Sequence, residues 1–164
     1  FDRKAVEEGI AIHKLIEMMA DAPLDMRVIE GQRWAKRLKL DPNLPERLHT
    51  LLRQPELGVF FSETAQSEVT IGGKNGFSGR IDRLAMTDDS IFLLDYKTNR
   101  QPPNVVGPEH RYAQQMAGYA QNLRAAFPGR DVKAALLWTQ TGQITWISEA
   151  VLSQALDQQH KAMA

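Results

Sequence analysis

The sequence predicts an α/β protein of the α+β type, in which a mixed β-sheet is flanked by helices. Three observations support this fold class. Apolar residues recur with helical spacing over 3–52, short strands separated by turns follow at 64–97, and a helix with two further strands occupies 109–148. An antiparallel meander followed by a crossover helix and another strand produces a mixed sheet covered by helices.

Each element has its own sequence signal. The first helix has a broad apolar arc at 100° per residue and ends before Pro23, which cannot continue it. That arc contains Val6, Gly9, Ile10, Ile12, His13, Ile16 and Met19, and in the second helix Val28, Ile29, Ala35 and Leu38 are predicted to face inward. The predicted helices are 3–20, 24–40, 44–52, 109–126 and 149–163, and the predicted strands are 64–71, 76–86, 91–97, 132–139 and 143–148.

Length and composition restrict the classes of protein to which this chain can belong. The 164 residues predict one domain, 1–164, with a helical side wall at 1–56 and a core at 57–164. The 20 basic and 20 acidic residues cancel, so phosphate binding would require local clusters or a metal. The absence of cysteine excludes disulfides and iron–sulfur clusters and is compatible with the cytosol. No apolar run approaches the roughly 18 residues of a membrane span, and the start at Phe1 suggests a piece of a larger protein.

The predicted hairpin at 76–97 concentrates charge at the end of an apolar run. Asp95 and Lys97 lie two residues apart on one strand, so their side chains project to the same face. Asp82, on the preceding strand, brings a second carboxylate beside them. Two neighbouring carboxylates repel unless a cation lies between them, so this set resembles a Mg²⁺ or Mn²⁺ site. A surface ion pair between Asp95 and Lys97 is the alternative, and these three residues alone slightly favour it.

Other polar residues occur where apolar ones are expected. His13 lies within the apolar arc, which indicates either a core histidine bonded to backbone or an imidazole directed at the metal. Glu68 lies on the strand next to the one that contains Asp82. On the helix 109–126, Tyr112, Gln115 and Tyr119 share one face.

Two further segments are assigned to ordinary structure. The basic residues between 27 and 39 are interpreted as a solvated face, with DNA-backbone contact as the minority interpretation. The glycine-rich stretch 72–76 lacks the spacing of a phosphate-binding loop, and its Asn-Gly pair is typical of a hairpin turn.

Taken in order, these segments resemble one family. The motifs that carry the resemblance are Gly9-Ile10-Ala11-Ile12-His13, Gly79-Arg80-Ile81-Asp82-Arg83-Leu84, Leu94-Asp95-Tyr96-Lys97-Thr98-Asn99-Arg100 and Tyr112-Ala113-Gln114-Gln115-Met116-Ala117-Gly118-Tyr119. Together they resemble the RecB-like branch of the PD-(D/E)XK nucleases over about residues 5–148, and most closely the C-terminal nuclease domains of AddA-type helicase–nuclease subunits. Ile81 replaces the proline of the signature, which RecB-like members commonly lack.

The resemblance implies a restriction-endonuclease-like core and a role for each polar residue. His13, Asp82, Asp95 and the carbonyl of Tyr96 would bind Mg²⁺ or Mn²⁺, since carboxylate and carbonyl oxygens suit Mg²⁺ and imidazole suits Mn²⁺. Lys97 would orient or deprotonate the attacking water. Glu68 would hold a water bound to the metal or a second ion. The side chains that would position the DNA or support the lysine are Gln115, Tyr119 and Tyr112.

The resemblance also implies a biological setting. It predicts a deoxyribonuclease, with exonuclease action expected, that processes double-strand breaks for recombinational repair in the bacterial cytoplasm. Its partners would be single-stranded DNA ends, the rest of a helicase polypeptide and an AddB-like subunit, without an iron–sulfur cluster or a membrane. The alternatives are a catalytically silent DNA-binding or docking domain and a stand-alone exonuclease.

Overall fold

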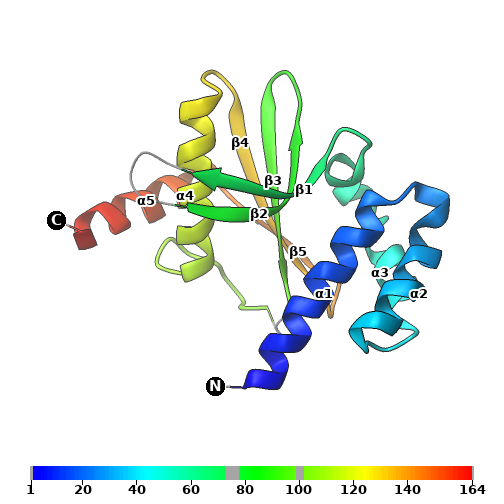
Figure 1. Cartoon of the computed structure of the whole chain (residues 1–164). Coiled ribbons are helices and arrows are strands. Elements are labelled where there is room, and N and C mark those ends of the chain that lie inside the picture. The colour runs from blue at the N-terminus through cyan, green and yellow to red at the C-terminus, as the bar shows by residue number, and fades with distance from the viewer. Residues whose placement is uncertain (1, 73–77, 99–101, 164) are drawn as a thin grey trace.

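The computed structural model describes residues 2–72, 78–98 and 102–163 and confirms the mixed sheet flanked by helices (Figure 1). The strands are β1 Gln66–Gly72, β2 Ser78–Met86, β3 Ser90–Lys97, β4 Asp131–Trp138 and β5 Ile144–Ile147, in spatial order β1-β2-β3-β4-β5. Only the β3–β4 pair is parallel, because α4 crosses over between these strands, and the other pairs are antiparallel. The predicted turn at 73–76 and the motif residues Asn99 and Arg100 lie outside the described residues.

The helices are α1 Arg3–Asp21, α2 Arg27–Leu38, α3 Leu44–Leu52, α4 Arg111–Ala126 and α5 Glu149–Met163. The second helix is shorter than predicted. The 3₁₀ turn η1, Leu24–Met26, precedes it, and Lys39 ends it in the left-handed conformation with φ 57°. A further 3₁₀ helix, η2 Pro55–Phe61, was not predicted, since its apolar residues lack the period of an α-helix. None of the helices in the described ranges is both long and apolar enough to cross a bilayer.

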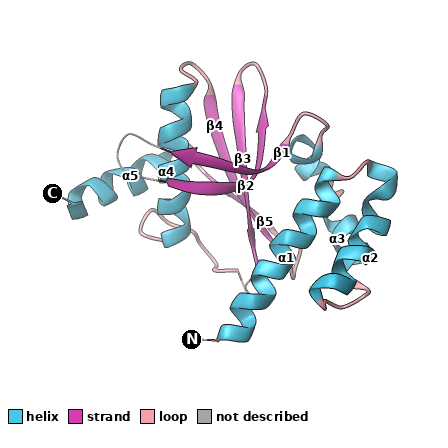
Figure 2. Ribbon diagram, in the orientation of Figure 1, coloured by secondary structure: helices cyan, strands magenta, loops and turns pink. Residues whose placement is uncertain are grey.

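Helices lie on both sides of the sheet (Figure 2), and each face of the sheet belongs to its own hydrophobic core. One core joins Ile91 and Leu93 of β3 to the buried face of α4 and to α5. The other joins Leu94 and Tyr96 of β3 to α1, α3 and η2. Alternate residues of β3 therefore enter opposite cores, as the two-residue period of a strand requires.

Three residues predicted to face inward are exposed instead. Val6, Ile10 and Ile29 are 47%, 66% and 44% exposed. The buried face of α1 consists of Gly9, Ile12, Leu15, Ile16, Met19 and Ala20, so it is narrower than the predicted arc. The N-terminal end of α1 extends past the ends of the strands (Figure 1). Val6 and Ile10 belong to this half of the helix, and the described structure covers them only in part.

We expect Gly31→Ala to lower the free energy of unfolding by about 1–3 kcal/mol, because overpacking a filled interior costs that much. A Cβ at Gly31 would lie 2.8 Å from Met19 Sδ and 2.9 Å from Pro45 Cβ, where α1, α2 and α3 meet. Urea denaturation measures the change. Gly58→Ala is the control, since a Cβ there meets nothing within 4 Å. Equal stability of the two variants would show that α2 can move to admit the methyl group.

Candidate active site

The strands β2 and β3 part at the candidate site. Their ladder runs from Met86↔Ile91 to Arg83↔Leu94 and goes no further among the described residues, so Asp82 and Asp95 would form the next pair. The Tyr96 N–H donates a hydrogen bond of 2.7 Å to Asp82 Oδ2. The carboxylate of Asp82 therefore replaces a backbone acceptor at the point where the two strands separate, and both aspartates are buried.

Lys97 is held in place from three sides. Its Nζ lies 2.5 Å from Asp95 Oδ2, donates a hydrogen bond of 3.2 Å to Gln115 Oε1, and lies 3.9 Å from the centre of the Tyr112 ring. The alternation of side chains along β3 brings Asp95 and Lys97 to the same face, as expected. The pair is buried beside a second carboxylate, so it is not the solvent-exposed ion pair of the alternative interpretation.

Burial raises the pKa of Asp95 to about 7, and the charge of Asp82 adds to the rise while Lys97 opposes it. The two carboxyl groups lie within hydrogen-bonding reach of each other. The site therefore holds more negative charge than Lys97 alone neutralises.

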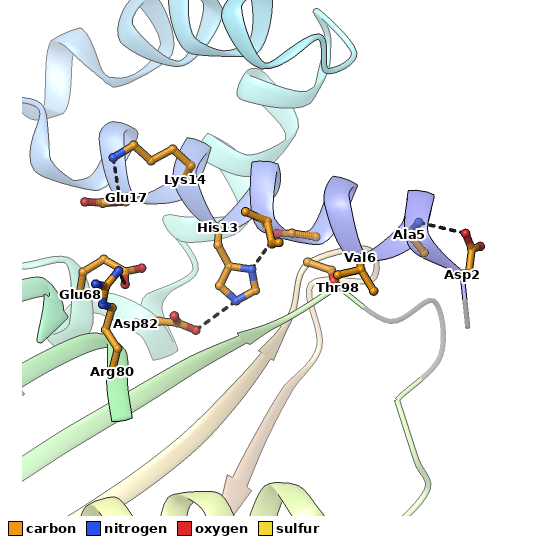
Figure 3. Close-up of a pocket in the computed structure, with 12 residues that line it drawn as sticks. Asp2, Ala5, Val6, His13, Lys14, Glu17, Glu68, Arg80, Asp82 and Thr98 are labelled. Carbon is orange, nitrogen blue, oxygen red and sulfur yellow. Dashed lines mark hydrogen bonds and ion pairs between the residues drawn. The ribbon is translucent and has the colours of Figure 1, made fainter. Parts of the chain in front are cut away.

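His13 connects α1 to Asp82, one of the two carboxylates (Figure 3). Its Nδ1–H donates to the Gly9 carbonyl at 2.8 Å, and its Nε2 lies 3.3 Å from Asp82 Oδ2. Since a carbonyl can only accept, this bond fixes the proton on Nδ1 and directs Nε2 toward Asp82. Burial alone would lower the pKa of His13, but the contact with Asp82 outweighs it and raises that pKa to about 9.

A shared divalent ion would require these side chains to rearrange. Among the described residues, no three His, Asp or Glu side chains surround a common point as they stand. However, two ligands at right angles about 2.1 Å from a Mg²⁺ ion are about 3 Å apart, close to the 3.3 Å between His13 Nε2 and Asp82 Oδ2. Asp95 and the backbone carbonyl of Tyr96 would complete the set. A histidine whose other nitrogen donates to a carbonyl is the usual arrangement in metal sites, so these residues fit Mg²⁺ or Mn²⁺.

Glu68 lies at the rim of the site rather than among the proposed ligands. Its backbone is left-handed, with φ 55°, although it lies within β1. Its carboxylate is 3.5 Å from the Arg80 guanidinium, and burial, followed by the charges of Asp82 and Glu17, raises its pKa. Non-glycine residues in this conformation are strained by about 1–3 kcal/mol and occur frequently at functional sites.

A chain of hydrogen bonds links Lys97 to the backbone of β2. Gln115 Nε2 donates to the Tyr119 hydroxyl at 3.3 Å, and that hydroxyl donates to the Arg80 carbonyl at 3.1 Å. Gly79 lies against the Tyr119 ring, where a Cβ would be 2.6 Å from Cε1. Gln115 and Tyr119 were predicted either to position DNA or to support Lys97, and these contacts are of the kind expected for support of Lys97.

A cleft of about 910 Å³ opens beside these residues, between α1 and the strands β1 and β2 (Figure 3). His13, Asp82 and Glu68 line it, together with four charged residues that the sequence patterns did not identify: Asp2, Lys14, Glu17 and Arg80. Helical spacing could have identified Glu17, since it lies four residues after His13. No sequence pattern identified Arg80, because its place beside the cleft and its contact with Glu68 depend on how β1 pairs with β2.

We expect Asp95→Asn to stabilise the metal-free protein by about 2–4 kcal/mol at pH 8 and much less at pH 4. Folding raises the pKa of Asp95, so the folded state holds the carboxyl proton more tightly than the unfolded chain does. The wild-type protein therefore loses stability as pH rises from the ordinary pKa of an aspartate to about 7. Asparagine does not titrate and avoids this loss. Chemical denaturation with chelator at several pH values measures it. A gain independent of pH would show that the charge of Asp95 is not the cause.

Comparison with known proteins gives one finding. A family model described as the PD-(D/E)XK nuclease superfamily matches residues 2–163. No curated protein matches the chain significantly. The match spans nearly the whole chain, including the sheet, the cleft and the candidate residues. With its five-stranded mixed sheet flanked by helices, the chain belongs to the PD-(D/E)XK nuclease superfamily.

Proposed function

We propose that this chain is a divalent-metal-dependent deoxyribonuclease that hydrolyses phosphodiester bonds. The observation that supports this most strongly is that the buried Asp82 and Asp95 and the partly buried Lys97 lie together where β2 and β3 separate, beside an open cleft. Members of the superfamily are typically metal-dependent nucleases. A buried pair of carboxylates with a lysine and a histidine is costly for stability, so a catalytic role explains its presence better than a structural one.

Each residue has a proposed role in the hydrolysis. A Mg²⁺ or Mn²⁺ ion held by His13, Asp82, Asp95 and the Tyr96 carbonyl would supply a Lewis acid. Lys97, positioned by Asp95 and by the chain through Gln115, would orient the attacking water and offset the charge of the phosphate. In the hydrolysis, the attacking water would give one proton to bulk water and form a new P–O bond, and the leaving oxygen would take one proton from bulk water as its own bond breaks. Glu68 would hold a water at the rim of the site.

The biological setting is also part of the proposal. The order of motifs supports a RecB-like nuclease of the AddA type, with residues 1–164 as one nuclease domain of a bacterial, cytoplasmic helicase–nuclease that processes double-strand breaks. In that setting the helicase and an AddB-like subunit would deliver single-stranded ends, and exonuclease action is expected. The lack of cysteine is consistent with a domain without an iron–sulfur cluster.

A gel assay tests the activity. Labelled single-stranded and duplex DNA are incubated with the protein in Mg²⁺, Mn²⁺ or chelator, beside Asp82→Asn as the inactive control. We expect cleavage in both metals, none in chelator, and loss in the variant. Binding of DNA without cleavage in either metal would contradict the proposal and favour a silent DNA-binding domain.

A further inference from the structure

One face of α1 leads along the cleft to the candidate metal ligand. Val6, Ile10, His13 and Glu17 recur at intervals of four, three and four residues, so they form one stripe, and all four line the cleft. The first two are the exposed apolar residues noted above, at 47% and 66%. The helix is anchored through a different face, so these two side chains contribute little to the core.

The stripe has the length of a few nucleotides. A helix rises 1.5 Å per residue, so Val6 lies about 10 Å from His13 along the axis, and Ile10 lies about 4.5 Å from it. Successive nucleotides are about 3.4 Å apart in a stacked strand and farther apart in an unstacked, extended one. An unstacked strand whose scissile phosphate lies at His13 and Asp82 would therefore bring its next one or two bases against Ile10 and Val6.

The opposite wall of the cleft carries one exposed guanidinium, that of Arg80, beside the carboxylates of Glu68 and Asp82. Arg80, on β2, is two-thirds exposed along its side chain, and its 3.5 Å pair with Glu68 is a weak one at the surface. Figure 3 shows Arg80 and Glu68 on the strand side of the cleft, with Val6 and His13 on the helix side. Exposed apolar side chains on the helix, facing an exposed guanidinium on the strand, suit a ligand with flat apolar bases on one side and phosphates on the other.

We propose that Val6 and Ile10 form a subsite for the nucleobases of an unpaired DNA strand, next to the scissile phosphate. This deepens the proposed function and rests on it for the position of the scissile bond. The faces of bases in a duplex are stacked on one another and are not available to aliphatic side chains. The subsite therefore favours single strands without reading sequence, because every base has an apolar face.

Binding to strands with and without bases tests the subsite. A fluorescent 12-nucleotide oligothymidylate and a tetrahydrofuran abasic strand of equal length are titrated by anisotropy in Ca²⁺. Burying about 60 Å² of apolar surface corresponds to about tenfold in affinity, so we expect the wild-type protein to prefer the oligothymidylate by about that factor. In the variant Val6→Ser with Ile10→Ser the preference falls below about twofold, and affinity for the abasic strand is unchanged.

The control is Ile29→Ser, which removes an exposed isoleucine on α2 outside the cleft and should keep the full preference. A wild-type protein that binds both strands equally, or a double variant that keeps the preference, would overturn the subsite. Cleavage of both strands in Mg²⁺ is measured alongside. Base preference without any cleavage would support the subsite and refute the nuclease, whereas cleavage without base preference would do the reverse.

Discussion

Replacing Lys97 with methionine is expected to slow DNA cleavage by about 10²- to 10⁴-fold, the range for loss of a positioned proton-transfer or charge-stabilising group. Lys97 is the cation nearest to the paired carboxylates, and contacts with Asp95 and Gln115 fix its Nζ. Methionine has a similar length but no charge, so the packing against the Tyr112 ring is largely retained. The measurement is the single-turnover cleavage rate in Mg²⁺ with labelled single-stranded DNA.

Two controls separate chemistry from folding. Lys133→Met removes a lysine from the neighbouring strand β4, where its Nζ lies over the Phe92 ring away from the cleft, and should leave the rate unchanged. Binding of DNA in Ca²⁺ shows whether the Lys97→Met protein still forms the cleft. If that variant binds DNA and cleaves it within about threefold of the wild-type rate, Lys97 has no role in the chemical step.

Tyr119 supports Lys97 indirectly, through Gln115, so its removal is expected to slow cleavage less than the loss of Lys97 itself. Tyr119→Phe keeps the ring against Gly79 but breaks the hydrogen bonds to Gln115 and to the Arg80 carbonyl. We expect a loss of about 3- to 30-fold in the cleavage rate, because the lysine becomes less well positioned. The affinity for DNA in Ca²⁺ should change little. A lower affinity with an unchanged rate would instead indicate that Tyr119 contacts the DNA.

Local periodicity was sufficient to predict the fold class and most element boundaries. The helices and strands follow from apolar spacing, and their ends follow from prolines, glycines and turn residues, so each prediction needs only neighbouring residues. The same rule placed Asp95 and Lys97 on one face of β3. Whether that face meets solvent or a second carboxylate depends on where β2 and β3 part, which local spacing does not determine.

Arg83 illustrates what required the tertiary structure. It follows Asp82, so it projects to the opposite side of β2, where its guanidinium donates to the Phe60 carbonyl and the Ser67 hydroxyl. It is almost fully buried and also pairs with Asp21 at 3.4 Å. These partners come from three distant segments of the chain, so no local pattern identified them. The left-handed conformation of Glu68 was missed for the same reason, since nothing in its neighbours requires it.

Binding of Mn²⁺ is expected to weaken about 30-fold as pH falls from 8.5 to 7. Contact with Asp82 holds the pKa of His13 near 9 against the opposing effect of burial, so the imidazole is protonated over this range. A metal ligand must be neutral, and a proton on Nε2 competes with the ion, which costs tenfold in affinity for each pH unit below the pKa. Below pH 7 protonation of Asp95 adds a second competing proton.

Calorimetry in buffers of different ionisation enthalpy measures this competition directly. At pH 8 the wild-type protein should release about one proton for each Mn²⁺ bound. His13→Gln keeps both carboxylates and a neutral side chain, so its affinity should be lower but nearly independent of pH between 7 and 8.5. Binding without proton release at pH 8 would show that His13 does not coordinate the ion, and the ligand set would then reduce to Asp82, Asp95 and the Tyr96 carbonyl.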